Sequence, residues 1–174
     1  METVSLTKEQ LRLIAGCQAF VDVTKRSSEE QFHYQPDGKW SVADVIQHLY
    51  LSARPLVKLM SGPRDVLLQW GKADAPSRAY EELATTYVQI LATGVKAPAA
   101  FTPRPEDMNA DKNAILERFT QEYQTLIKLI GTWSELDLDT YMVPHPAFGK
   151  LTVREMLHFT SAHTHHHLRL LPKF

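Results

Sequence analysis

The spacing of apolar residues is the feature that most limits how this chain can fold. Along most of the 174 residues, apolar side chains recur at intervals of three and four, which gathers them on one face of an α-helix. No segment shows the sustained alternation of apolar and polar residues that is typical of a half-buried strand. The pattern therefore predicts an all-α protein without a β-sheet.

Capping signals divide this pattern into four long helices and one shorter one. We expect helices over residues 7–25, 41–61, 77–94, 111–133 and 152–171. Thr7, Ser41 and Thr152 are the expected N-caps of three long helices, and Ser77 is the expected N-cap of the shorter one. Long amphipathic helices bury their apolar faces best against one another. We therefore expect a four-helix bundle with an additional short helix.

The length of the chain predicts a single domain that comprises residues 1–174. The connections between the expected helices are longer than is usual in a bundle. They fall at residues 26–40, 62–76, 95–110 and 135–151. Connections of this length often cover a binding site.

Charge and composition argue against several classes of partner. The formal net charge is −1, from 19 basic and 20 acidic residues, and like charges form no long run. We therefore expect neither nucleic acid nor a membrane surface as a partner. No apolar run reaches the length of a spanning helix, and the start of the chain lacks a leader pattern. With a single cysteine, Cys17, on the apolar stripe of the first helix, we expect a cytoplasmic protein.

Histidine is the residue type with an unusual distribution, because five of the eight lie within ten residues near the C-terminus. On a helical wheel of the last helix, His163 and His167 lie towards the apolar face. His158 and His165 lie on the opposite side and His166 on the flank, and we interpret these three as a solvated face. Two histidines four residues apart stack on one side of a helix and can share one metal ion.

A third ligand has to come from another helix, and His48 is the best candidate. It lies near the middle of the second helix, at the border of the apolar stripe. Neutral imidazole suits Zn, Ni, Cu and Fe, and three such ligands leave positions open for water or substrate. The alternative interpretation is that all three are hydrogen-bonded core histidines. Trp40, just before the N-cap, is expected to anchor the core.

Two segments resemble the sequence motifs of the DinB/YfiT-like superfamily. PDGKWSVADVIQHL resembles the first motif, in which a Trp-Ser or Trp-Thr cap precedes a helix with a metal-binding histidine, here His48. VPHPAFGKLTVREMLHFTSAHTHHH resembles the second, YfiT-type motif, with His163 and His167 at its two ligand positions. The resemblance implies a four-helix bundle with one Zn or Ni ion, often as a homodimer. Many relatives follow the last ligand with Arg-Gly-Gln, whereas this chain has Leu168-Arg169-Leu170.

Two activities implied by the family resemblance and one non-enzymatic alternative leave three functions open. The first is a metal-dependent S-transferase that activates a low-molecular-weight thiol cofactor for transfer to a small electrophile. The second is a metal-dependent hydrolase that activates a bound water. The third is a metal-stabilised binding or stress-response module without turnover. The sequence favours an enzyme with a small-molecule substrate over the third function, with S-transfer as the first choice and hydrolysis nearly level with it.

The residues that would serve these reactions are less defined than the metal ligands. Basic residues at the mouth of a pocket would favour an anionic thiol, and Arg54, Arg104 and Arg169 are the candidates. A carboxylate in the pocket would favour hydrolysis, but Glu155 and Asp44 are expected to point outward. Further candidates for substrate binding or proton transfer are Tyr50, Tyr141 and His145.

Overall fold

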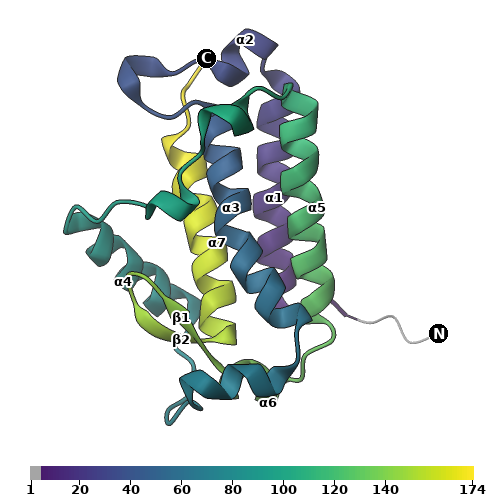
Figure 1. Ribbon diagram of the computed structural model, residues 1–174, viewed down its shortest axis with the longest axis vertical. Helices are drawn as coiled ribbons and strands as arrows, with labels where there is room; N and C mark the ends of the chain where they lie inside the picture. The colour runs from purple at the N-terminus through teal and green to yellow at the C-terminus, as the bar shows by residue number, and fades with distance from the viewer. Residues whose placement is uncertain (1–4) are drawn as a thin grey trace.

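Four long helices stand side by side and form the core of the molecule, which a computed structural model describes for residues 5–174 (Figure 1). They are α1 (Lys8–Arg26), α3 (Val42–Ser61), α5 (Lys112–Ile130) and α7 (Val153–Leu170). α3 packs against α5, and α1 packs against both α5 and α7. The predicted all-α class and four-helix bundle are confirmed. Only the first four residues lie outside the described part of the chain.

Each long helix begins where a side chain can accept a hydrogen bond from its first turn. Thr7, Ser41 and Thr152 accept from the backbone N–H three residues on, and Asp111 does the same for α5. In the first three cases the residue three positions on also accepts from the backbone N–H of the cap, which completes a capping box. The sequence predicted these four starts correctly.

The shorter helix begins two residues later than expected. α4 (Tyr80–Ala92) has Ala79 at its N-cap position, without a side-chain hydrogen bond, so the prediction of Ser77 as N-cap is wrong. The Ser77 hydroxyl instead donates to Asp139 and lies 2.7 Å from the hydroxyl of Thr152. α4 packs against α7 outside the four-helix core (Figure 1).

The long connections contain more regular structure than the sequence predicted. Besides α2 (Glu29–His33) and α6 (Glu135–Thr140), there are four short 3₁₀ segments: η1 (Pro36–Gly38), η2 (Arg64–Trp70), η3 (Ala99–Phe101) and η4 (Pro105–Met108). An antiparallel hairpin of β1 (Met142–His145) and β2 (Gly149–Thr152) leads directly into α7. The expectation that the chain has no sheet is therefore wrong. Strands of four residues, one of them with Pro144, are too short to produce a recognisable alternation.

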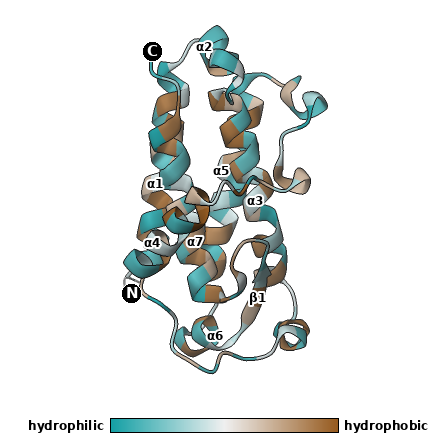
Figure 2. Ribbon diagram, turned by 90° about the vertical axis from the view of Figure 1, so that its left-hand side faces the viewer, coloured by the Kyte–Doolittle hydropathy of each residue, from teal (hydrophilic) through white to brown (hydrophobic). Residues whose placement is uncertain are grey.

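Aromatic rings fill the centre of the bundle between α1 and α5. The rings of Phe20 and Phe119 pack edge to face at 5.7 Å, and Tyr123 lies 4.4 Å from Phe119. Hydrophobic and hydrophilic residues alternate along the bundle helices in Figure 2, as expected for helices with one buried face.

Cys17 is buried as predicted, and burial raises the pKa of its thiol to about 11. No helix within residues 5–174 combines the length and apolar character needed to cross a membrane.

Candidate metal centre

Three histidine side chains from two helices of the bundle meet at one point. The Nε2 atom of His163, on α7, lies 2.9 Å from Nε2 of His48 on α3 and 3.1 Å from Nε2 of His167. The three potential ligand atoms lie within 4.8 Å of one another. The sequence predicted that these residues would come together, and the structure places them so.

The backbone of a connecting segment fixes the orientation of the His48 ring. Nδ1 of His48 lies 2.6 Å from the carbonyl oxygen of Phe101, at the end of η3. A carbonyl can only accept, so Nδ1 carries the proton and Nε2 presents a lone pair to the other two histidines. Such an outer hydrogen bond is the usual companion of a metal-ligating histidine. Phe101 lies in the Pro-rich connection that was predicted only to be a long loop.

Aromatic rings surround the three histidines. The ring of Trp40 lies 4.9 Å from His48 and stacks at 6.1 Å on His167. The ring of Phe159, one turn before His163, stacks on His163 at 5.1 Å. Trp40 thus packs against the core, as predicted, but its position beside the histidines was not predicted.

Burial keeps the three imidazoles neutral. His48 and His163 are only 3% and 7% exposed, and burial lowers the pKa of both side chains. For His163 the neighbouring histidines lower the pKa further. Burial, and then the proximity of His48 and His166, lowers the pKa of His167 to about 3. Neutral imidazole is the form that ligates a metal, so the donor set is ready at neutral pH.

The donor set fits a divalent transition-metal ion. Nitrogen ligands of one tetrahedral ion lie roughly 3.4 Å apart, because each bond is about 2.1 Å long. The Nε2–Nε2 distances from His163 to His48 and to His167 are a few tenths of an ångström shorter than this. The His48 lone pair and its two neighbours converge on a space where a cation would satisfy all three. Nitrogen donors of this kind suit Zn or Ni better than Mg or Ca.

A cavity of about 490 Å³ opens beside the three histidines. Its walls come from α3, α4, α7, the hairpin and the connection before η3. Most of the lining is apolar or aromatic, and Tyr87 contributes a hydroxyl whose pKa burial raises to about 12. A metal ion at the histidines would therefore have open positions that face a pocket of ligand size.

Of the predicted substrate-binding candidates, only His145 lines this cavity. Tyr50 lies outside it, as does Arg54, whose guanidinium lies 5.5 Å from the Tyr50 ring. Arg169 and Tyr141 are also absent from its walls, and Arg104 lines a second, smaller hollow instead. None of the three arginines predicted at the mouth of the pocket lines this cavity. The basic residue in its wall is Lys96, which the sequence analysis did not identify as a candidate.

The two carboxylates that were expected to point outward are buried. Asp44 and Glu155 are each 6% exposed, because each completes the capping box of its helix. Glu155 also accepts from the backbone and side chain of Arg78. Neither carboxylate lines the cavity, so neither faces the three histidines.

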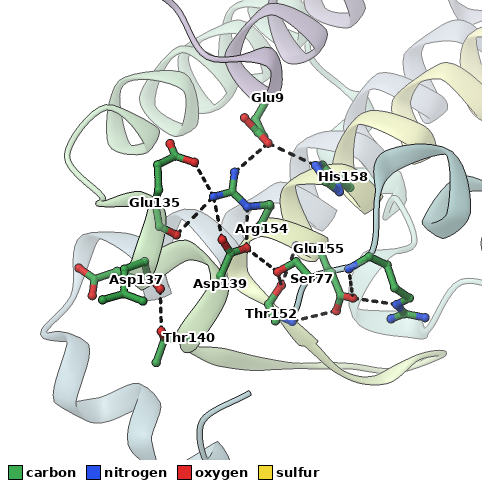
Figure 3. A network of polar contacts seen from close by, with 12 residues as sticks. Glu9, Ser77, Glu135, Asp137, Asp139, Thr140, Thr152, Arg154, Glu155 and His158 are labelled. Atoms are coloured by element: carbon green, nitrogen blue, oxygen red, sulfur yellow. Dashed lines mark hydrogen bonds and ion pairs between the residues drawn. The ribbon is translucent and has the colours of Figure 1, made fainter. Parts of the chain in front are cut away.

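The solvated face predicted for α7 is wrong at His158. That side chain is 5% exposed, and its Nε2 lies 3.3 Å from the Glu9 carboxylate on α1 (Figure 3). His165 is half-buried, with Nδ1 hydrogen-bonded to the carbonyl of Ser161. The wheel assumed one buried face, whereas α1, α3, α4 and α6 all pack against α7. Both histidines nevertheless point away from the three-histidine group, as the wheel predicted. The prediction is also wrong at His166, which is half-buried and lines the cavity.

Comparison with known proteins identifies the class of this helical, three-histidine protein. The sequence profile of the DinB superfamily matches residues 12–171, and the chain belongs to this superfamily. A curated relative is YuaE of Bacillus subtilis (strain 168), an uncharacterized protein that is 26% identical over 150 residues, or 83% of each chain.

A solved structure with the same fold is YfiT from Bacillus subtilis, described as having an unusual four-helix bundle topology. The two chains superpose with a TM-score of 0.63 and are 16% identical. The alignment covers 97% of this chain and 87% of YfiT. At this level of identity the likeness establishes the fold. The expected resemblance to the DinB/YfiT-like superfamily is confirmed.

Proposed function

We propose that this protein is an enzyme that binds one divalent ion, Zn or Ni, through His48, His163 and His167. The observation that carries the proposal is the convergence of three neutral imidazoles beside a ligand-sized cavity. Three ligands leave positions free, which is the arrangement of a catalytic rather than a structural site. When bound, such an ion supplies a Lewis acid that lowers the pKa of a water or thiol.

Hydrolysis is the reaction that we favour. YfiT, which shares the fold, is described as a probable metal-dependent hydrolase. Neighbouring residues of this chain orient the three histidines for such a reaction. The Phe101 carbonyl holds His48 in the ligating orientation, while the rings of Trp40 and Phe159 stack on His167 and His163.

Transfer of a low-molecular-weight thiol is the second candidate. The observation in its favour is Lys96, an exposed cation in the cavity wall that could pair with an anionic thiol. A highly charged cofactor would need more cations than this one. Thiol transfer therefore ranks below hydrolysis.

The first experiment is elemental analysis of untagged protein. We expect about one equivalent of Zn or Ni in the wild type and none in His48→Ala or His163→Ala. His165→Ala is the matched control, because His165 lies between the two α7 ligands in sequence but turns its ring towards Ser161. Metal in all four proteins, or in none after incubation with Zn and Ni, would refute the ligand assignment.

The second experiment separates the two reactions. Metal-loaded protein is assayed with 4-nitrophenyl acetate for hydrolysis, and with cysteine and 1-chloro-2,4-dinitrobenzene for thiol transfer. Chelation should abolish the true activity, and re-addition of the metal should restore it. Turnover that persists in His163→Ala would arise from another part of the protein and would contradict the proposal.

A further inference from the structure

The cavity beside the three histidines has almost no charge in its walls. Lys96 is its one charged side chain among residues 5–174, and no aspartate, glutamate or arginine of that range lines it. Leucine, proline, valine and phenylalanine side chains make up much of the surface, with Leu49, Leu56, Leu91, Val143 and Phe159 as examples. Apolar walls favour the body of an uncharged, apolar ligand, because a charge would lose its hydration there.

Several polar side chains interrupt this apolar surface, Tyr87, His166 and His145 among them, and the backbone fixes the orientation of the His145 ring. His145, at the end of β1, accepts hydrogen bonds through Nδ1 from the backbone N–H groups of Ala147 (3.1 Å) and Phe148 (3.2 Å). A nitrogen that accepts carries no proton, so the neutral ring has its proton on Nε2. Burial lowers the pKa of His145 to about 4, which is consistent with a neutral ring at pH 7.

The Nε2–H group of His145 is therefore a donor in need of an acceptor. Within residues 5–174 no group accepts from it, although the ring is half-buried between Phe148 and Phe159. Donors in apolar surroundings are nearly always paired with a protein group, a water or a ligand. The tight turn after β1 fixes this donor in place, because both Nδ1 contacts are to its backbone.

The donor lies one aromatic ring away from the three histidines. The ring of Phe159 packs edge to face on His145 at 4.2 Å and stacks on His163 at 5.1 Å. A ligand that spans the cavity along Phe159 could thus face the histidines with one group and His145 with another. This geometry separates the reacting end of a ligand from the acceptor that holds it.

We propose that the cavity binds an uncharged, largely apolar small molecule, and that His145 donates a hydrogen bond from Nε2 to an acceptor oxygen of that molecule. The acceptor, a carbonyl or an ether oxygen, lies about one ring width from the group that faces the histidines. His145 is a positioning and specificity residue and takes no part in bond making. The inference rests on the proposed function in one respect: it takes this cavity as the substrate site.

Three probes of similar shape test this inference. Benzophenone has one carbonyl acceptor, diphenylmethane has none, and 4-benzoylbenzoate adds a negative charge. Binding of each is measured by equilibrium dialysis, with metal-loaded protein and again after chelation, so that coordination of an oxygen to the metal does not mimic the hydrogen bond. In chelated wild-type protein we expect benzophenone to bind about two- to tenfold more tightly than diphenylmethane, because its carbonyl gains one neutral hydrogen bond from His145. We expect 4-benzoylbenzoate to bind least tightly there.

Variants assign the preference to His145. His145→Phe keeps an aromatic ring but removes the donor, so benzophenone and diphenylmethane should bind it equally. His145→Gln keeps an N–H donor and should restore part of the preference. His33→Phe is the matched control, because His33 lies outside this cavity and the change should leave the preference intact. An unchanged preference in His145→Phe, or no preference in the wild type, would overturn the proposal.

A second measurement does not depend on any variant being folded. Irradiated benzophenone attaches covalently to nearby C–H bonds, and wild-type peptides that line the cavity, such as the one containing Met156, should carry the adduct. Adducts only on other surfaces would refute the site. A ketone preference in a protein that takes up no Zn or Ni in the elemental analysis would refute only the proposed function, whereas a protein that takes up the metal but shows no ketone preference would refute only this inference.

Discussion

The Nδ1 atom of His48 donates a 2.6 Å hydrogen bond to the carbonyl oxygen of Phe101, 53 residues further along the chain. This contact ties the centre of α3 to the connection that precedes α5, and it decides which nitrogen of His48 faces His163. A backbone carbonyl in a connecting segment thus controls the chemistry of a helical side chain.

The first prediction concerns the tautomers of two histidines. His48 should carry its proton on Nδ1 and His145 on Nε2, because one faces a carbonyl oxygen and the other faces two N–H groups. Two-bond ¹H–¹⁵N correlation spectra distinguish the two forms directly, with His48→Ala and His145→Phe to assign the signals. The same tautomer at both positions would contradict the geometry described here.

The second prediction concerns Arg154, which joins three acidic residues at the start of α7. Its guanidinium donates to Glu9, Glu135 and Asp139, and the side chain is 14% exposed (Figure 3). Arg154→Ala should lower the free energy of unfolding by about 3 kcal/mol, because it leaves the buried Glu9 carboxylate without its cation.

Urea unfolding followed by circular dichroism checks this value. The control is Arg104→Ala, which removes one partner of an exposed pair at 4.0 Å from Glu106. That change should cost less than about 1 kcal/mol. Equal effects of the two substitutions would mean that the Arg154 network contributes no more to the free energy of unfolding than an exposed ion pair does.

The third prediction is a loss of stability in acid that depends on Glu9. Hydrogen bonds from His158 and Arg154 outweigh the effect of burial and lower the pKa of Glu9 well below its usual value of 4.5. Below pH 4.5 the unfolded chain therefore binds a proton at Glu9 that the folded chain does not. The free energy of unfolding should decrease as the pH falls from about 5 towards 2.

Glu9→Gln tests this pH dependence, because glutamine does not titrate. The variant should be less stable than the wild type at pH 7, but the difference should shrink as the pH falls. Urea unfolding at a series of pH values gives the slope of the free energy of unfolding against pH for the wild type and for the variant. Parallel slopes for the two proteins would show that Glu9 titrates normally in the folded state.

The fourth prediction concerns Gly16, where α1 lies close to α7. A Cβ at this position would lie 2.9 Å from Cγ2 of Thr164, and Thr164 is held in place by a hydrogen bond between its hydroxyl and Tyr123. Alanine usually stabilises a helix relative to glycine by roughly 0.5–1 kcal/mol. Here the overlap should outweigh that gain, and Gly16→Ala should destabilise the fold by about 1–3 kcal/mol.

A second substitution supplies the control for this overlap. Thr164→Ser removes the methyl group but keeps the hydroxyl, so Gly16→Ala should be tolerated better in the Thr164→Ser background. Thermal unfolding of the two single variants and the double variant gives the coupling between the positions. Additive effects would mean that the methyl group is not the obstacle.

The sequence by itself determined the four long helices of the bundle and which histidines are candidates for metal ligation. Capping at Thr7, Ser41, Asp111 and Thr152 depends on contacts within a few residues, and so does the spacing of His163 and His167. Such local relationships are readable without knowledge of the fold. The homodimer, the choice between Zn and Ni and the cytoplasmic location stay predictions.

Only the tertiary structure decided what surrounds these residues. The burial of His158, the Phe101 carbonyl that orients His48, and the apolar cavity with His145 at its edge all join segments that are far apart in the chain. A helical wheel describes one helix against one core, but α7 contacts other elements on several sides. Which face is buried, and which polar group reaches the site, therefore depends on how all the helices and connections pack together.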